Sequence, residues 1–292
     1  MKRHKFKKKQ LALFFSFLTF ESFKWQIEAV WQFYKNDLNE FHLTAPRQNG
    51  KSQILVLIVL VELFLNDAKI TFTSHSTKNC DEFFQKIKHE INSNEDFVEQ
   101  VDRMINTKGG QLITLKNGSK ISFIARTKDG GIGDSNDVII FDEFQLMNTK
   151  QVSAIFPTLA ARPDSITIYA GTAPRSIDDD TFYREQRKNH YGKPSWIEYG
   201  IGHEYDLEYL KKHDLFLDKD LLKKANPSYG IMIPYKNIVR EFGKMDVLDY
   251  AIQRLGMFHT QTQKAIFNQN AINKVLIGQE EAQEYKGKFI IG

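Results

Sequence analysis

A short loop near the start of the chain carries the residue types that bind nucleotide phosphates. It reads Ala45-Pro46-Arg47-Gln48-Asn49-Gly50-Lys51-Ser52, between a predicted strand and a predicted helix. The standard phosphate loop is G-x-x-x-x-G-K-[ST], and Ala45 stands where its first glycine would be. Gly50 still permits a turn that directs backbone N–H groups at phosphates, and the next helix points its positive end at them. Lys51 can then reach the β- and γ-phosphates, and Ser52 can offer its hydroxyl to Mg²⁺.

Two carboxylates follow an apolar run about 90 residues later, in the segment Val138-Ile139-Ile140-Phe141-Asp142-Glu143. Such a run is typical of a central strand buried on both faces. At its end, Asp142 can hold Mg²⁺ through water, and Glu143 can act as general base for an attacking water. Together with the phosphate loop, this pair predicts nucleotide hydrolysis rather than binding alone.

Two weaker signals lie on either side. A third strand runs into Gly171-Thr172-Ala173-Pro174, where Thr172 can sense a γ-phosphate. Before the first strand, Gln26 of the pair Trp25-Gln26 can read an adenine edge with its paired donor and acceptor. The alternative for this pair is a helix whose Trp belongs to the core.

Strands and helices alternate in the pattern that places these residues at strand ends. This alternation predicts an α/β fold with a mostly parallel central sheet flanked by helices. The phosphate loop and the two carboxylates at a strand end place this fold in the P-loop NTPase (ASCE/RecA-like) type. We expect a small helical subdomain after about Ile201. The predicted strands are Phe41–Ala45, Lys69–Ser74, Leu112–Leu115, Ser119–Ile124, Val138–Phe141 and Ser165–Ala170, with a hairpin turn at Asn117-Gly118. The predicted helices are Ser52–Leu65, Thr77–Ile105 with a break near Asn92, Val152–Ala161, and several within Leu207–Phe258.

The net charge, the cysteine count and the N-terminal apolar run of the 292-residue chain exclude only a few classes of protein. A net charge of +4 is compatible with nucleic-acid contact without requiring it. The one cysteine, Cys80, excludes an intramolecular disulfide and a cysteine-based metal cluster. A lysine-rich start precedes the apolar run Leu11–Phe20, which lacks a signal-peptide cleavage site and is too short to span a membrane. We expect a helix there whose apolar face packs on the domain; a DNA-touching arm is the alternative.

In order and spacing, these motifs resemble the ATPase domain of the large terminase subunit of tailed viruses. The family's phosphate loop carries an arginine near its start, as Arg47 does here, and Ala225-Asn226-Pro227 resembles a short signature after the core fold. The likeness extends from about Phe20 to Phe258. It implies an adenine motif at Trp25-Gln26 and a coupling motif at Gly171-Thr172.

The resemblance also implies roles and partners. Arg47 would contact the γ-phosphate in cis, and an arginine from a neighbouring subunit would complete the site in trans. Arg126 is the first candidate for that arginine and Arg162 the second; the alternative for each is an ordinary surface residue. The implied substrate is ATP with Mg²⁺. The implied partners are double-stranded DNA, a portal protein, a small terminase subunit and further copies in a ring, in the host cytoplasm and without a membrane. A monomer in isolation is the alternative to the ring.

The expected domains are residues 1–20 as a basic arm and helix, 21–200 as the ATPase core, 201–259 as a helical linker subdomain, and 260–292 as a linker and the first strand of a missing nuclease domain. The family usually adds a nuclease domain. Because the sequence stops after Phe289-Ile290-Ile291, in what reads as that domain's first strand, we expect no DNA cleavage by this chain.

Two other functions fit parts of the pattern. Asp142-Glu143-Phe144-Gln145 also matches a DExx-type helicase or translocase, although no second nucleotide-binding repeat follows. The second alternative function is a regulatory module that binds nucleotide with little turnover. The intact Glu143 argues against this alternative.

Overall fold

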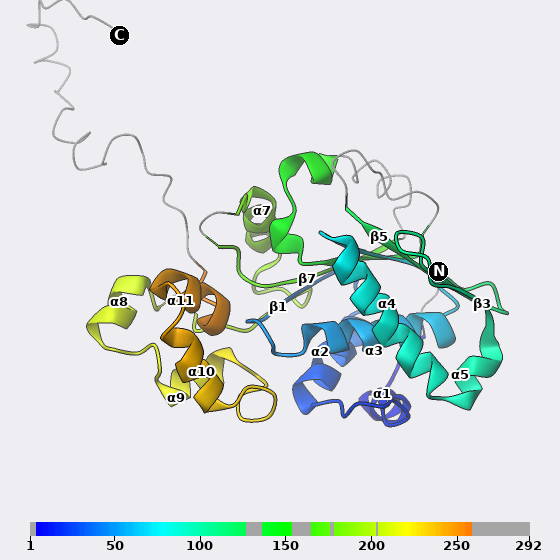
Figure 1. The fold of residues 1–292 in the computed structure, drawn as a ribbon, viewed down its shortest axis with the longest axis horizontal. Helices are drawn as coiled ribbons and strands as arrows, with labels where there is room; N and C mark the ends of the chain where they lie inside the picture. Colours follow the sequence, from blue (N-terminus) through cyan, green and yellow to red (C-terminus); the bar gives the residue numbers. More distant parts are fainter. Residues whose placement is uncertain (1–3, 127–135, 154–164, 176–177, 203, 259–292) are drawn as a thin grey trace, which may run out of the picture. The chain divides into compact units, whose positions relative to one another are not determined.

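An eight-stranded sheet runs through the centre of the computed structural model, in the order β3-β4-β5-β2-β6-β7-β1-β8 (Figure 1). All neighbours from β5 to β8 pair in parallel, whereas β3-β4 and β4-β5 pair antiparallel. The strands are β1 Glu40–Thr44, β2 Lys69–Ser74, β3 Val101–Ile105, β4 Leu112–Leu115, β5 Lys120–Ala125, β6 Val138–Asp142, β7 Ile166–Gly171 and β8 Trp196–Glu198. The predicted α/β class and mostly parallel sheet are confirmed.

The structure describes residues 4–126, 136–153, 165–175, 178–202 and 204–258. All of them belong to one compact unit, Met1–His259, and a second unit covers Thr260–Gly292. Among the described helices, none has the length and apolar character needed to cross a membrane.

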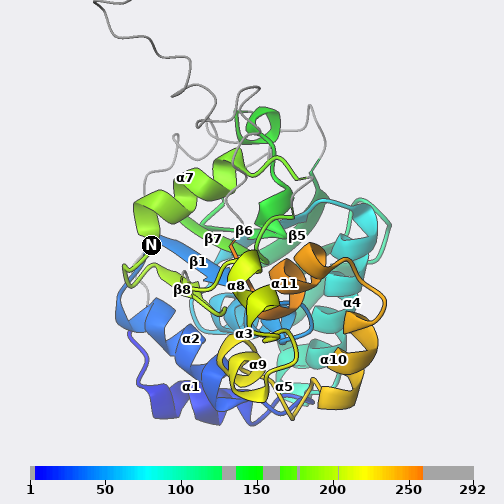
Figure 2. The same ribbon diagram turned by 90° about the vertical axis from the view of Figure 1, so that its left-hand side faces the viewer.

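Helices cover both faces of the sheet (Figures 1 and 2). Their bounds are α1 Lys8–Phe15, α2 Lys24–Lys35, α3 Lys51–Phe64, α4 Thr77–Asn92, α5 Glu95–Gln100, η1 Phe144–Leu146, α7 Thr181–His190, α8 Leu207–Lys212, α9 Lys219–Ala225, α10 Tyr235–Phe242 and α11 Val247–Leu255. The first five helices share one apolar core with one face of the sheet. The opposite face packs against α7 and η1.

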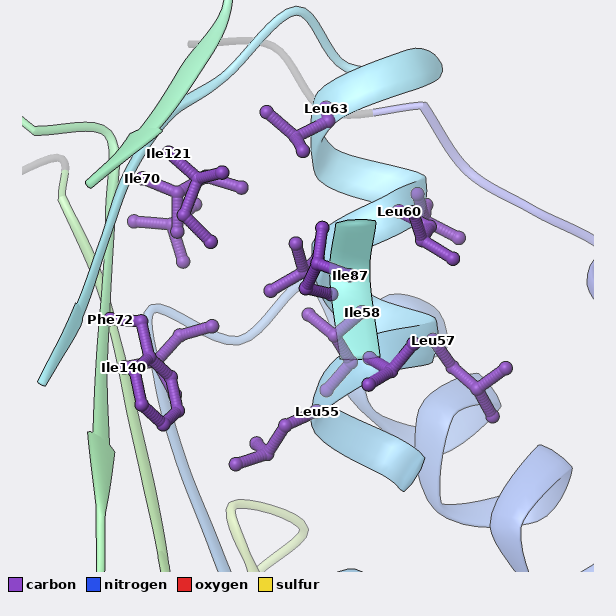
Figure 3. Close-up of a cluster of buried hydrophobic side chains, with 14 of the residues drawn as sticks. Leu55, Leu57, Ile58, Leu60, Leu63, Ile70, Phe72, Ile87, Ile121 and Ile140 are labelled. Carbon is purple, nitrogen blue, oxygen red and sulfur yellow. The ribbon is translucent and has the colours of Figure 1, made fainter. Parts of the chain in front are cut away.

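The strand β6 shows why the sheet is buried on both sides. Ile140 joins the core shared with α3 and α4, whereas Ile139 and Phe141 join the core beneath α7. Figure 3 shows Ile140 beside Phe72, facing the apolar side chains of α3. Because side chains alternate along a strand, an uninterrupted apolar run fits a strand with helices on both faces.

The expected helix Thr77–Ile105 is wrong at its C-terminal end. The helix breaks near Asn92 as predicted, and Asn94 caps α5 by accepting a hydrogen bond from the Phe97 N–H. Residues Val101–Ile105 then form β3, which pairs with β4. The strand conformation of this segment depends on its pairing with β4, and this pairing cannot be predicted from the periodicity of the segment itself.

Some of the other predicted elements are present in the structure, and some of the observed elements were not predicted. The hairpin is confirmed between β4 and β5, with Gly118 at φ +89° in its turn. The N-terminal helix is confirmed as α1, whose Leu11 and Phe15 are buried in the main core. Most of the expected helix Val152–Ala161 lies outside the described residues, although 149–153 are helical. Neither α7 nor β8 was predicted.

The four short helices α8 to α11 surround a core of their own, which includes Leu222, Ile238, Tyr250 and Leu255. The helical character expected after Ile201 is therefore confirmed. The division of the chain into four domains stays a prediction.

Candidate active site

The phosphate-binding loop connects the end of β1 to the first residue of α3, Lys51. Gly50 has φ +92°, a left-handed conformation that favours glycine. A Cβ atom at this position would lie 2.6 Å from Gln26 Nε2 and 2.9 Å from Gln53 Oε1. The backbone conformation therefore favours the glycine that the sequence pattern identified, and a side chain there would displace the ends of Gln26 and Gln53.

A cavity of about 1140 Å³ brings together most of the predicted site residues. The phosphate loop, the end of β6 and the end of β7 all contribute to it. The predicted residues that line it are Arg47, Gln48, Gly50, Lys51, Ser52, Asp142, Glu143, Gly171 and Thr172. This is the arrangement expected at the carboxyl ends of neighbouring parallel strands.

Lys51 lies inside the phosphate loop. Its Nζ donates hydrogen bonds to the carbonyl oxygens of Ala45 at 2.6 Å and Pro46 at 3.1 Å. Burial lowers the pKa of Lys51 to about 8, partly opposed by the negative charge of Asp142. A poorly hydrated ammonium group at this position has much to gain from a phosphate anion.

Asp142 sits at the end of β6, where burial is the main cause that raises its pKa to about 6. The neighbouring Glu143 charge raises it further, whereas Lys51 and Arg126 lower it. Its Oδ1 also accepts a hydrogen bond from the Glu143 N–H at 3.0 Å. This carboxylate is short of compensating charge, and a divalent cation would supply it.

Glu143 has φ +53°, which is uncommon for a residue with a side chain and typical of functional sites. Its Oε2 accepts a hydrogen bond from Asn79 Nδ2 at 2.9 Å and is paired with His75 Nδ1. His75 directly follows β2, and Asn79 lies in the first turn of α4. Sequence reasoning missed both; the position of His75 after a strand parallel to β6 was the available signal.

Arg126, which was expected to face a neighbouring subunit, is buried inside its own. The side chain is buried, and its guanidinium donates to the carbonyl oxygens of Thr73 at 3.0 Å, Asp142 at 2.9 Å and Glu143 at 3.2 Å. Burial lowers its pKa to about 10. The guanidinium is thus bonded to backbone groups of its own subunit, whereas the role in trans stays a prediction. Arg162 lies outside the described residues.

The pair Trp25-Gln26 lies behind the phosphate loop rather than along the cavity. Gln26 is fully buried; its Nε2 donates to the Gly50 carbonyl oxygen at 3.2 Å and to Gln53 Oε1 at 2.8 Å. Trp25 Nε1 donates to the Ser228 hydroxyl at 3.0 Å. Because these groups are already satisfied, the geometry favours the alternative, a supporting role in the core, over reading of adenine.

The phosphate loop is also tied to the C-terminal helices. Asn49 Nδ2 donates to Asn226 Oδ1 at 2.9 Å, and Asn49 Oδ1 accepts from the Ser228 N–H at 3.1 Å. Arg254 donates to the Arg47 carbonyl oxygen at 3.2 Å and to Gln48 Oε1 at 3.1 Å. We call this set of contacts the loop clamp. Its Asn226 belongs to the Ala225-Asn226-Pro227 signature, whereas sequence reasoning missed Ser228 and Arg254.

A side-chain contact joins the acidic strand to the predicted coupling motif. The Thr172 N–H donates to Gln145 Oε1 at 3.1 Å. A Cβ atom on Gly171 would lie 2.3 Å from the same oxygen, so a larger residue would displace Gln145. The ends of β6 and β7 are therefore in direct contact beside the cavity.

Comparison with known proteins gives this site a family context. The profile of a family described as "Terminase large subunit, ATPase domain" matches residues 21–189. No curated protein sequence matches the chain.

Solved structures show the same fold. The large terminase of bacteriophage HK97 aligns with a TM-score of 0.68 and 16% identity, over 86% of this chain and 55% of that one. The large terminase ATPase domain of Thermus phage P74-26 aligns with a TM-score of 0.56 and 15% identity, over 85% and 98%. The chain thus spans about half the length of the HK97 protein and nearly all of the isolated P74-26 domain.

Proposed function

Since this chain belongs to the family of terminase large subunit ATPase domains, we propose that it hydrolyses ATP to drive double-stranded viral DNA into a procapsid. The proposed partners are the DNA, a portal protein and a small terminase subunit. The working state is a ring of identical subunits in the host cytoplasm. The observation that carries the proposal is the shared cavity of the phosphate loop, the acidic strand end and the coupling motif.

The cavity's donor set fits a nucleotide with Mg²⁺. The Asp142 carboxylate and the Ser52 hydroxyl are hard oxygen ligands of the kind that Mg²⁺ prefers, and both line the cavity. When bound, Mg²⁺ would neutralise charge on the β- and γ-phosphate oxygens. Lys51 would hold the same phosphates, and the exposed Arg47 would contact the γ-phosphate in cis. Pro46, Gln48, Asn49 and Gly50 shape the loop around them.

Glu143 is the proposed general base. It would accept a proton from the water whose oxygen attacks the γ-phosphorus, while the bond to the β–γ bridging oxygen breaks and ADP leaves. In the structure its carboxylate is held by Asn79 and His75. Hydrolysis therefore requires Glu143 to turn toward the phosphate site, or water to enter between these groups.

Thr172 and Gln145 supply the proposed coupling. Their contact joins the strand that bears the general base to the strand that bears the coupling motif. A change at the γ-phosphate that moves the end of β6 would therefore be transmitted to β7 and to the segment that follows it.

The proposed function is tested by phosphate release from the full chain with ATP, with and without Mg²⁺ and double-stranded DNA. We expect release that requires Mg²⁺ and rises with duplex DNA and with protein concentration, since a ring assembles at higher concentration. A helicase would instead separate forked DNA as a monomer, an outcome that would contradict the packaging proposal. DNA-independent binding of ATP with no turnover would support the regulatory module.

The pH dependence of kcat/KM follows from the two buried charges. Asp142, with a pKa near 6, must be ionised to bind Mg²⁺, so activity should rise as the pH increases through about 6. Lys51, with a pKa near 8, must be protonated to bind phosphate, so activity should fall as the pH increases through about 8. We expect a bell-shaped profile, because kcat/KM reports the groups of the free enzyme. A profile that is flat between pH 5 and 9 would contradict both assignments.

A further inference from the structure

The phosphate loop holds one end of a nucleotide, and the base at the other end needs a surface of its own. Trp25 and Gln26 do not line the cavity, and their side-chain donors already have partners inside the protein. The cavity volume of about 1140 Å³ exceeds the roughly 300–1,000 Å³ of typical small-molecule sites. Met232 and Asn237, from the segment after α9, also line this cavity.

Met232 belongs to a tight turn, residues 228–233, that is attached to the phosphate loop. Its N–H donates to the Ser228 carbonyl oxygen at 3.0 Å, which closes the turn. The Ser228 hydroxyl donates to the Asn49 carbonyl oxygen at 2.8 Å and accepts from Trp25 Nε1 at 3.0 Å. The turn is therefore held both by the phosphate loop and by α2.

This turn places the Met232 side chain directly against the phosphate loop. Its sulfur lies 3.2 Å from the position that a Cβ atom on Gly50 would take. The residue is nevertheless 41% exposed, so much of its surface is open to a ligand. A thioether is polarisable and packs favourably against aromatic rings. Met232 thus offers the loop end of the cavity an apolar surface suited to a purine.

Asn237 supplies polar groups in the same cavity. It lies in the first turn of α10 and is exposed. Among the described residues, its side-chain amide has no hydrogen-bond partner. An amide carries both a donor and an acceptor, and an asparagine can pair with the N6 amino group and N7 of adenine through both. The free amide is therefore complementary to an adenine edge.

We propose that Met232 and Asn237 form the base subsite for ATP: Met232 packs against the face of the adenine, and Asn237 hydrogen-bonds to its edge. The proposal rests on the ATPase function proposed above and adds the residues that select the base. Because both residues belong to the segment that follows α9, a bound base brings part of the C-terminal helical region into direct contact with the nucleotide.

The test compares the binding of ATP and of inorganic triphosphate to the full chain, each with Mg²⁺, by calorimetry. Triphosphate occupies the phosphate loop without a base, so wild type should bind ATP more tightly. Met232→Ala should weaken ATP binding by about 3–10-fold, the range of a sulfur–aromatic contact. Asn237→Ala should weaken it by about 2–10-fold, the range of a hydrogen bond. Neither variant should change the affinity for triphosphate.

A change of base preference tests the role of Asn237 more sharply. Asn237→Asp keeps the size of the side chain but leaves only acceptors, which suit the N–H donors of guanine and not the N7 acceptor of adenine. The ratio of ATP to GTP affinity should fall by about 10-fold, since one base contact is worth that much discrimination. An added negative charge repels both triphosphates equally, so the ratio isolates the contact with the base.

The controls are Ile231→Ala and Val239→Ala, which change exposed apolar neighbours that do not line the cavity. Both should keep wild-type affinity for ATP and for triphosphate. The proposal is overturned if wild type binds ATP no more tightly than triphosphate, if Met232→Ala and Asn237→Ala keep the wild-type preference, or if they lose affinity for both ligands in parallel. These are binding measurements, so a chain that binds ATP without hydrolysing it would contradict the proposed function and leave the base subsite intact.

Discussion

Replacing Glu143 by glutamine should reduce ATP turnover by about 10²–10⁴-fold and leave ATP binding close to wild type. The magnitude is that of losing a positioned general base. The amide has the size of the carboxylate but cannot accept the water proton. In the proposed mechanism phosphate binding depends instead on Lys51 and the loop, which line the cavity and are not changed by the substitution. Single-turnover phosphate release measures the first effect, and binding of a fluorescent ATP analogue measures the second.

A matched control for this variant is Glu185→Gln, which changes an exposed glutamate on α7 that does not line the cavity. It should leave both turnover and binding unchanged. If Glu143→Gln hydrolysed ATP at the wild-type rate, the assignment of Glu143 as the base would be wrong, whatever the fate of the packaging proposal.

The second large effect is on stability: Arg126→Met should lower the free energy of unfolding by about 2–4 kcal/mol. The substitution keeps the apolar stem but deprives the carbonyl oxygens of Thr73, Asp142 and Glu143, the first of them in a buried hydrogen bond, of a charged donor. It also removes a positive charge that lowers the pKa of Asp142. That pKa must therefore rise, and the acidic limb of the kcat/KM profile should move to higher pH. Urea denaturation measures the first effect.

Arg103→Met, at an exposed position on β3, is the control for a change of charge alone and should alter neither quantity. Mixing subunits tests the role in trans directly. An arginine supplied by a neighbour would let Arg126→Met subunits recover activity when mixed with Glu143→Gln subunits. The buried contacts of Arg126 favour a role inside its own subunit, for which we expect no recovery; full recovery together with wild-type stability would contradict the buried role.

The site residues that could be predicted from the sequence are those whose role is marked by their immediate neighbours in the chain. The phosphate loop and the run Val138–Glu143 each carry their signal in consecutive residues, because a turn and a buried strand impose types and order on their own segment. The convergence of these two segments then follows from the rules of parallel sheets.

What escaped prediction depends on contacts between distant segments. Arg254 reaches the phosphate loop across 207 positions, and nothing in its neighbours marks it. Asn79 is an ordinary residue in the first turn of a helix until the fold places it on Glu143. Arg126 was expected to face a neighbouring subunit or, as the alternative, solvent, and only the packing of β2, β5 and β6 shows that it is buried. The strand β3 was read as helix for the same reason.

The loop clamp gives the phosphate loop a mechanical property that its sequence alone does not suggest. Asn49 is bonded to Asn226 and Ser228, and the backbone beside it is bonded to Arg254. These partners are themselves connected, because Asn226 Nδ2 donates to the Arg254 carbonyl oxygen at 2.9 Å. The phosphate loop, the C-terminal end of α9 and α11 are therefore each hydrogen-bonded to the other two. A displacement of the loop by even an ångström must carry these helices with it or break several buried hydrogen bonds at once.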